Sequence, residues 1–259
     1  MIADVNQQSS SKKQLLTALI ITYNEERNIE TAIADLDFAD EIIVVDSYST
    51  DRTAELIAAN KKVKVVQHPF ENFSAQRNFA ISLASHAWIL FIDADERITA
   101  PLRTEIQNTL EQENSHTSYY FYRTFMFKNT PLGFSGWQTD KIIRLFKKEE
   151  AQYNPQKIVH EKLIVSGTTG KFKNKLIHYS YFDYIGYKQK MIQYGKLKAL
   201  EELKKGTKPN LFHYYIRPLY HFMYRYFIRL GALDGRKGII ICYLNAMSIS
   251  VRFQELKKL

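Results

Sequence analysis

Three apolar runs in the first hundred residues each end in oxygen-bearing side chains, and this repeat limits the fold more than any other feature of the chain. LTALIITYNEERNIETAI (residues 16–33) and EIIVVDSYSTDRTAELIA (41–58) both begin with a β-branched run, pass through a polar junction and continue with helical spacing. WILFIDADE (88–96) repeats the apolar run and ends in Asp93 and Asp95. Strands that alternate with helices in this way predict a parallel sheet covered on both faces.

The ends of the predicted strands place Thr22, Asp46 and Asp93 at one edge of this sheet. Ligands of open parallel sheets bind at that edge, outside the carboxyl ends of the strands. An isolated Asp-x-Asp is weak evidence, because acidic residues often close a strand in a solvated turn. Three polar strand ends at the same edge are not expected from that interpretation. The Asp pair therefore predicts two hard oxygen ligands for a divalent ion beside a diphosphate.

The chain resembles the inverting family 2 glycosyltransferases, which use a nucleotide-sugar donor in a Rossmann-like fold called GT-A. The resemblance is carried by TYNEE (22–26), VVDSYSTDRT (44–53), QRN (76–78) and IDADE (92–96). A weaker likeness continues through DKIIRLF (140–146), His160-Glu161 and GALDGRKG (231–238), and the fuller set is most similar to bacterial enzymes that glucosylate the lipopolysaccharide inner core. The resemblance implies an α/β fold: a GT-A-like, Rossmann-type, mostly parallel sheet followed by a helical, basic C-terminal region.

The resemblance also implies a nucleotide-sugar site, with UDP as the expected nucleotide. Asp46 would contact the base or ribose, since a carboxylate accepts hydrogen bonds from nucleobase N–H and ribose hydroxyl groups. The first loop would line the same pocket, and Arg77 would add positive charge near the phosphates, although a helical arginine is as often a surface residue. The first-loop residues are Thr22, Tyr23, Asn24 and Glu25.

By the same resemblance, Asp95 would ligate Mg²⁺ or Mn²⁺ directly, and Asp93 would lie nearer the ribose or a metal-bound water. The ion would act as a Lewis acid on the departing phosphate. Inversion is a single displacement, so a base must take the proton of the acceptor hydroxyl. Glu161 is the first candidate and Asp140 the second, because the chain lacks the paired acids that many family members carry there. His160 either orients Glu161 or is an ordinary hydrogen-bonded residue.

The charge distribution separates the last third of the chain from the rest. Residues 171–259 contain 18 Lys and Arg against 5 Asp and Glu, a net charge of +13, whereas residues 1–170 contain 18 against 22, a net charge of −4. Aromatic residues and arginines alternate along a helix expected over residues 211–230. Tyr and Arg suit a membrane headgroup zone, so an anionic membrane surface is the expected partner, with charge as the attractant.

Other interpretations of the same residues remain open at this point. The aromatic residues could be core, the basic face could be merely solvated, and a nucleic-acid-binding protein would also combine basic and aromatic residues. No nucleic acid is expected, however, because no matching motif is found and the Asp motifs would be unexplained. A sugar nucleotidyltransferase shares a Rossmann-like sheet, but its basic, Gly-rich loop is replaced here by the acidic TYNEE.

These observations predict a tail at residues 1–14, a catalytic domain at 15–180 and a helical, membrane-associating region at 181–259. The N-terminus lacks the apolar segment of a secretory signal, and no run has the roughly 18 apolar residues of a spanning helix. We therefore expect a cytoplasmic protein, peripheral on the inner face of the membrane, with a lipid-linked glycan as acceptor. Asn24 is expected to cap a helix that contains Glu25 and Glu26, and residues 128–140 are expected to form a mobile loop over a site.

Overall fold

The computed structural model describes residues 13–112, 116–154, 162–181 and 183–259, which divide into two compact units. The first unit comprises the residues up to Tyr122 together with Lys141–Leu176, and the second comprises Arg123–Asp140 together with Ile177–Leu259. The first unit contains β1 (Leu16–Thr22), α1 (Ile29–Ala34), β2 (Glu41–Asp46), α2 (Thr53–Ala58), β3 (Val63–Gln67), α3 (Phe73–Leu83), β4 (Trp88–Phe91), β5 (Glu96–Arg97), α4 (Ala100–Glu111), β8 (Lys141–Lys147), η1 (Lys148–Glu150), β9 (Ala151–Tyr153), β10 (Leu163–Val165) and β11 (Thr169–Lys171).

The second unit is mainly helical. Two strands, β6 (Ser118–Phe127) and β12 (Leu176–Tyr181), run from the first unit into the second. The remaining elements of the second unit are β7 (Thr130–Leu132), α5 (Tyr184–Lys204), η2 (Phe212–Ile216), α6 (Arg217–Met223), η3 (Tyr224–Ile228), η4 (Gly231–Asp234) and α7 (Gly235–Leu256). No helix among the described residues is both long enough and apolar enough to cross a membrane.

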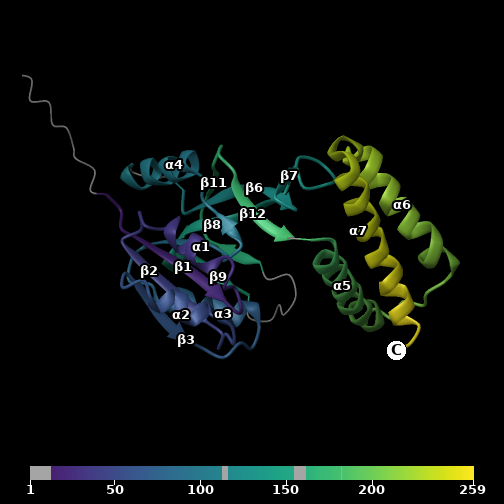
Figure 1. The fold of residues 1–259 in the computed structure, drawn as a ribbon, viewed down its shortest axis with the longest axis horizontal. Coiled ribbons are helices and arrows are strands. Elements are labelled where there is room, and N and C mark those ends of the chain that lie inside the picture. The colour runs from purple at the N-terminus through teal and green to yellow at the C-terminus, as the bar shows by residue number, and fades with distance from the viewer. Residues whose placement is uncertain (1–12, 113–115, 155–161, 182) are drawn as a thin grey trace, which may run out of the picture. The chain divides into compact units, whose positions relative to one another are not determined.

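Four parallel strands in the order β3-β2-β1-β4 form the predicted sheet (Figure 1). Helices cover both faces, as expected, because alternate residues of a strand point to opposite sides. On one face Ala18 and Ile20 belong to the same core cluster as residues of α1 and α4, and on the other face Leu19 packs with residues of α3. Because both faces are buried, β1 and β2 are apolar without interruption over most of their length.

The sheet continues beyond β4 with strands of the opposite direction. β8 pairs antiparallel with β4, and β6 pairs antiparallel with β8. The direct register of Leu90 with Leu145 places Arg144, the residue before Leu145, close to the carboxyl end of β4. An antiparallel strand thus carries a side chain to the edge that the parallel strands define.

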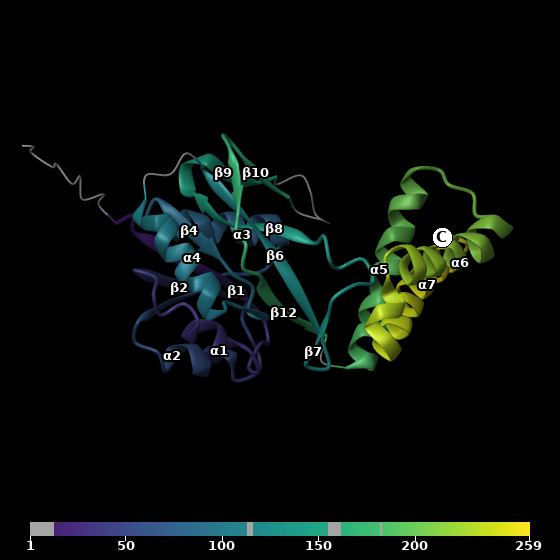
Figure 2. The same ribbon diagram turned by 90° about the horizontal axis from the view of Figure 1, so that it is seen from above.

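In the second unit, α7 packs against α5 and against the helical segment η2–α6–η3, and Figures 1 and 2 show α7 alongside α5 and α6. Gly195 allows α5 and α7 to approach closely, since a Cβ atom there would lie 2.7 Å from the carbonyl oxygen of Ser248. Inside this packing, Asn245 donates a hydrogen bond of 2.6 Å to the hydroxyl of Tyr187. Burial raises the pKa of that Tyr187 hydroxyl.

Residues 128–140 are tied to the rest of the second unit. The segment contains β7, which pairs with the end of β6. The carboxylate of Asp234 accepts hydrogen bonds from the backbone N–H of Gly133 at 2.9 Å and from the hydroxyl of Ser135 at 2.7 Å. The turn-rich sequence therefore forms an anchored segment rather than the free loop expected from its Gly, Pro and Asn content.

The first helix does not begin where the sequence predicts it. Asn24 does not cap a helix: its φ angle is 55°, and α1 begins five residues later, at Ile29. The backbone N–H of Asn24 and that of Glu25 instead donate to Ser49 and Thr53 of the second junction. Contacts with a distant segment override the local preference of an Asn-Glu-Glu sequence for a helix start.

Candidate active site at the carboxyl edge of the sheet

The register of the parallel strands brings the predicted strand-end residues to one edge. Thr22 pairs directly with Asp46, and Asp46 with Gln67. On the other side of β1, the backbone N–H of Ile92 donates to the carbonyl oxygen of Leu19 at 2.9 Å, which extends the contact of β1 with β4 toward Asp93. The expected juxtaposition of Thr22, Asp46 and the Asp-x-Asp sequence is therefore present in the fold.

Hydrogen bonds join the first loop to the loop that follows β2. The side-chain oxygen of Asn24 accepts from the backbone N–H of Thr50 at 2.8 Å, and the backbone N–H of Glu25 donates to the hydroxyl of Thr53 at 2.8 Å. The carboxylate of Glu25 accepts from the amide of Asn28 at 2.7 Å. Two of the predicted donor-binding residues thus fix the shape of the edge, whatever they contact in a complex.

Asp46 lies fully buried at the end of β2. Its carboxylate accepts hydrogen bonds from the hydroxyl of Ser49, from the backbone N–H of Ser49 at 3.0 Å and from the amide of Gln67 at 3.4 Å. Beside it, the buried hydroxyl of Thr22 has no hydrogen-bond partner among the residues that the structure describes. A buried hydroxyl in this state is a candidate contact for a bound ligand.

Two tyrosines flank these buried groups and are exposed. Tyr23 is 56% exposed and Tyr48 is 54% exposed, although both follow closely after buried strands. Tyr48 adopts a φ angle of 58°, which is uncommon for a residue with a bulky side chain. Tyr23 was a predicted donor residue, whereas Tyr48 was not singled out, although it lies within the VVDSYSTDRT sequence.

Asp93 is held between two arginines. Its Oδ1 atom accepts from Nη2 of Arg77 at 2.9 Å, and its Oδ2 atom accepts from Nη2 of Arg144. The same Nη2 atom of Arg144 donates to Glu96 at 2.8 Å, and Glu96 also accepts from the backbone N–H of Asp93 at 3.1 Å. We call these four residues the Asp93 cluster.

The Asp93 cluster is largely removed from water. Arg144 and Glu96 are fully buried, and Arg77 is 6% exposed. Burial by itself lowers the pKa of Arg144, but the charges of Asp93 and Glu96 outweigh burial and raise that pKa above its ordinary value. Two arginines and two carboxylates balance in charge, which a cluster at this depth requires. The alternative of a surface position for Arg77 is therefore wrong.

Asp95 is partly exposed, in contrast to its buried neighbours Ala94 and Glu96. Among the described residues, no group of three or more His, Cys, Asp and Glu side chains could hold a metal ion. Mg²⁺ commonly binds through one or two carboxylates together with substrate phosphates, so this edge fits such an ion. Both oxygens of Asp93 accept hydrogen bonds from arginines, and the assignment of Asp95 as the direct ligand stays a prediction.

The QRN sequence on α3 connects three parts of the site. Gln76 donates to the hydroxyl of Ser47 at 3.0 Å, after β2, and Arg77 binds Asp93. Asn78 donates to the carbonyl oxygen of Tyr153 at 2.8 Å and accepts from the backbone N–H of Tyr153 at 2.9 Å. Each residue of the motif thus holds a different element in place, and Arg77 acts through Asp93 in this structure.

The two candidate bases are placed differently by the structure. Glu161, and with it His160, lies outside the described residues. Asp140 belongs to the second unit, where its Oδ2 atom accepts a hydrogen bond of 2.6 Å from Nε of Arg123. This carboxylate is already engaged in an ion pair, and the ranking of Glu161 before Asp140 stays a prediction.

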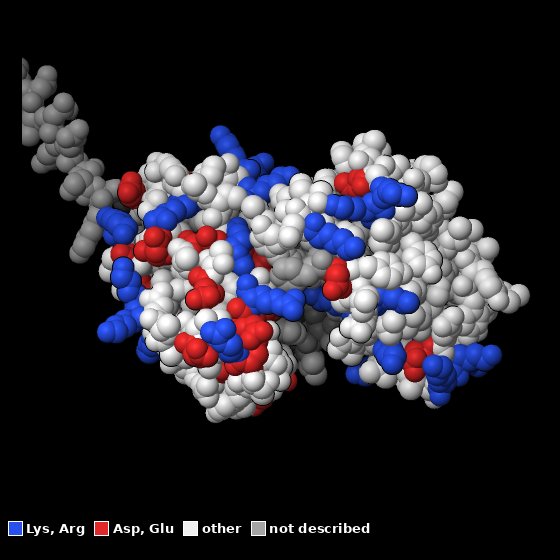
Figure 3. All heavy atoms as spheres, in the orientation of Figure 1, with Lys and Arg blue, Asp and Glu red and all other residues white. Residues whose placement is uncertain are grey.

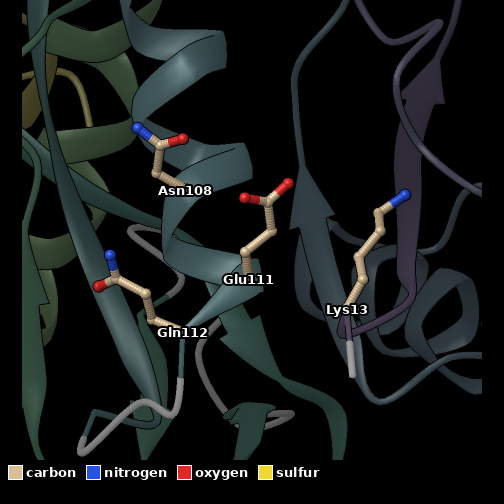
Figure 4. A pocket seen from close by; sticks show the side chains of 4 residues that line it. All are labelled: Lys13, Asn108, Glu111 and Gln112. Carbon is tan, nitrogen blue, oxygen red and sulfur yellow. The ribbon is translucent and has the colours of Figure 1, made fainter. Parts of the chain in front are cut away.

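A separate hollow on the first unit lies at the opposite end of β1. Figure 4 shows Asn108, Glu111 and Gln112 projecting from α4 near Lys13, which precedes the strand. The residues of the candidate active site follow the end of β1, at Thr22. The hollow in Figure 4 therefore does not contribute to the site described above.

Comparison with known proteins agrees with this arrangement. The pattern of the family described as Glycosyl transferase family 2 matches residues 17–193, more than half of the sequence, so the chain belongs to this family. The protein is accordingly a glycosyltransferase of this family, with the α/β fold described above.

Relatives of similar length are found in bacteria. An uncharacterised glycosyltransferase of Rickettsia bellii is 30% identical and covers 94% of this chain and 86% of its own. The lipopolysaccharide core biosynthesis glycosyltransferase LpsC of Rhizobium meliloti is 26% identical, with 92% of each chain covered.

Similar solved structures include residues 1–349 of TarS from S. aureus in complex with UDP. That structure has 15% identity and a TM-score of 0.46, with 94% of this chain and 90% of TarS covered. Another is glucosyl-3-phosphoglycerate synthase of Mycobacterium tuberculosis in complex with Mn²⁺, UDP and phosphoglyceric acid, with 23% identity, 43% coverage of each chain and a TM-score of 0.36.

Sequence reasoning missed two members of the Asp93 cluster, Arg144 and Glu96. Arg144 lies in DKIIRLF and Glu96 lies in IDADE, two sequences that carry the family resemblance. Neither residue was predicted to form an ion pair. The signal available was a charged residue inside an otherwise apolar strand, because a buried charge requires a counterion. The identity of that counterion, 51 residues away in the sequence for Arg144 and Asp93, depends on the fold.

Proposed function

We propose that the protein is a metal-dependent, inverting glycosyltransferase that moves a hexose from a UDP-sugar to a membrane-linked glycan such as the lipopolysaccharide core. The observation that carries this proposal is the gathering of oxygen-bearing side chains at one edge of the parallel sheet. Thr22 and Asp46 are direct partners at the ends of β1 and β2. The loop after β4 carries Asp93, which two arginines fix, and the partly exposed Asp95.

In this proposal Asp95, with Asp93 beside it, holds Mg²⁺ or Mn²⁺ against the diphosphate. The ion supplies Lewis-acid stabilisation of the negative charge on the leaving group. The Asp93 cluster keeps this loop in one geometry before the donor arrives, because its charges are paired and three of its four members, Arg77, Arg144 and Glu96, are buried. Arg77 and Arg144 thus contribute by orienting the acidic loop.

The nucleoside lies at the ends of β1 and β2 in this proposal. Thr22 offers a buried hydroxyl that has no partner among the described residues, and Asp46 offers a carboxylate next to it. Tyr23 and Tyr48 are exposed aromatic residues on the two adjoining loops. Aromatic faces of this kind can stack on a nucleobase, and Asn24 and Glu25 hold the loops that carry them.

The membrane-linked acceptor is supported by two observations. LpsC, a lipopolysaccharide core glycosyltransferase by its name, matches the chain over 92% of both lengths. The net charge of +13 in residues 171–259 also favours an anionic membrane surface. The protein would then act as a peripheral enzyme on a membrane that carries its acceptor.

The metal assignment is tested by titrating UDP into the protein with and without Mn²⁺ in a calorimeter. Asp95→Ala should remove the Mn²⁺-dependent part of UDP binding and lower turnover by at least about 10²-fold, since a lost metal contact costs several kcal/mol in the transition state. Asp37→Ala, which removes an exposed aspartate of the same unit, is the control. Unchanged Mn²⁺-dependent affinity in Asp95→Ala would show that the metal assignment is wrong.

The base assignment is tested by Glu161→Gln, which keeps the size of the side chain. Donor affinity should stay intact, and turnover should fall by at least about 10²-fold, the usual effect of a lost general base. Asp140→Asn is the comparison variant. An active Glu161→Gln together with an inactive Asp140→Asn would reverse the ranking, and loss of donor binding in Glu161→Gln would make Glu161 a structural residue.

A further inference from the structure

The helical segment formed by η2, α6 and η3 has its apolar side chains on the outside. Ten large apolar residues occur in adjacent pairs every four positions, and each is at least 38% exposed. We call them the apolar ridge. They are Leu211, Phe212, Tyr215, Ile216, Leu219, Tyr220, Met223, Tyr224, Phe227 and Ile228.

The backbone of the segment is wound to match this four-residue repeat. In a regular α-helix with 3.6 residues per turn, a four-residue repeat rotates by about 40° at each step and would wind around the helix. Phe212–Ile216 and Tyr224–Ile228 are π-helical, with a wider turn closed by bonds from residue i to i+5. One such bond of 2.9 Å joins the N–H of Arg229 to the carbonyl of Tyr224. The pairs therefore stay on one face.

The charged residues of the same segment point toward its own unit. Arg229 donates to the hydroxyl of Thr139 at 2.8 Å, and Arg225 donates to the carbonyl oxygen of Ser135 at 2.8 Å. The guanidinium of Arg217 lies over the ring of Phe253 on α7, 5.2 Å from its centre. A surface helix normally turns its apolar face to the core and its charges to water. This segment does the reverse.

The chemistry at the border of the ridge indicates what covers it. Residues 207–233 contain no Asp or Glu, and exposed basic residues stand at the two ends, Lys204, Lys205 and Lys208 before it and Arg236 after it. On the face drawn in Figure 3, the area around α6 is mostly free of charged side chains, with Lys and Arg near its border. Apolar and tyrosine side chains bordered by cations match a lipid interface with anionic headgroups.

We propose that the apolar ridge inserts into the interfacial layer of a lipid bilayer, so that hydrophobic insertion rather than charge is the main source of attachment. This inference rests on the proposed function in that a lipid-linked acceptor places the enzyme at a membrane. It also changes the expectation drawn from the net charge. Attachment depends on ten exposed side chains along about 25 Å of helix, and the basic border adds a smaller contribution that salt weakens.

The test uses the full chain and flotation with vesicles of phosphatidylcholine, with or without 30% phosphatidylglycerol as a chosen probe composition, at low and high NaCl. We expect binding to both kinds of vesicle, stronger to the anionic one, with the greater part retained at high salt. The triple variant Leu219→Ser, Met223→Ser, Phe227→Ser should bind at least about 100-fold more weakly, because each buried apolar side chain contributes about tenfold or more to transfer from water. The matched control is Leu15→Ser, Ile164→Ser, Ile185→Ser, whose residues are 50%, 56% and 65% exposed.

A second measurement does not depend on these variants. Cys242 is the single cysteine and is fully buried, so Tyr220→Cys and Ile164→Cys each supply one accessible thiol for an environment-sensitive dye. The dye at position 220 should shift to shorter wavelength when vesicles are added, and the dye at 164 should not. Equal behaviour of the two positions would overturn the proposal.

Two further outcomes separate the alternatives. If the protein does not bind vesicles but forms a dimer that the ridge triple variant abolishes, the ridge is an interface between copies of the chain. The lipid proposal is then wrong. UDP and Mn²⁺ titration of the same samples tests the proposed function independently. Vesicle binding without Mn²⁺-dependent UDP binding would reject the metal-dependent UDP donor and leave the ridge proposal standing.

Discussion

The Asp93 cluster and the η2–α6–η3 segment both turn charged residues inward, but they do so with different partners. In the Asp93 cluster the inward arginines, Arg77 and Arg144, meet the carboxylates of Asp93 and Glu96. In the helical segment, Arg229 meets a hydroxyl and a backbone carbonyl, and Arg217 lies over an aromatic ring. The first arrangement fixes a loop that must hold a ligand, and the second leaves the outer face of a helix apolar.

Charged side chains that face inward therefore serve different purposes in the two regions. A buried ion pair contributes little net stability but is costly to break, because removal of one member leaves an uncompensated charge. When an arginine that donates to neutral acceptors is removed, no uncompensated charge is left behind. The two regions should therefore respond unequally to the same kind of substitution.

The largest effect is expected for Arg144→Met. The substitution keeps much of the volume but leaves Asp93 and Glu96 without one arginine, so the free energy of unfolding should fall by about 3–5 kcal/mol. Urea denaturation followed by circular dichroism measures it. Lys141→Met, at an exposed position of the same strand, is the control. Glu96→Gln added to Arg144→Met should recover part of the loss, and no recovery would mean that the charge of Glu96 is not the cause.

A smaller effect is expected for Arg229→Met in the helical segment. The guanidinium donates to the Thr139 hydroxyl at 2.8 Å and to the Gly136 carbonyl at 3.4 Å, and both acceptors are neutral. The free energy of unfolding should fall by about 1.5 kcal/mol, the lower end of the range for hydrogen bonds with a charged group, because Arg229 is partly exposed. The same denaturation series measures it. A loss as large as that of Arg144→Met would remove the distinction between the two regions.

A pH-dependent effect is expected for His221, which also faces inward on α6. Burial, followed by the positive charges of Arg225, Arg252 and Arg217, lowers its pKa to about 4. Between pH 6.5 and about 4 the unfolded chain binds a proton that the folded protein does not, so the free energy of unfolding should decrease as the pH falls through this window. His221→Gln should show a shallower decrease than the unaltered protein when urea midpoints at pH 7.5 and 5 are compared. Identical slopes would assign the acid sensitivity to other groups.

The sequence predicted the parallel half of the fold and the position of the candidate site well. Apolar runs that end in Thr22, Asp46 and Asp93 identify both the strands and the edge at which they end, because strand pattern and chain order together fix a parallel register. The strands β1, β2 and β4 begin the ranges 16–33, 41–58 and 88–96, in which the apolar runs predicted them. These features depend on periodicity within a short window, and the sequence contains that information directly.

The sequence alone did not predict which groups surround the site or which face of a helix is outside. Arg144 reaches Asp93 only because β8 pairs with β4 in the antiparallel direction. Asn24 does not begin a helix, and its side chain instead accepts a hydrogen bond from Thr50 in another loop. The aromatic residues of 211–230 could equally have formed a core, and the structure instead exposes five of them, Phe212, Tyr215, Tyr220, Tyr224 and Phe227, in the apolar ridge. Sequence patterns thus determined the strands, their shared edge and the basic C-terminal third, since these depend on local spacing and composition. Only the tertiary structure decided the partners of the buried charges and the outward direction of the ridge, because both depend on contacts between segments that are far apart in the chain.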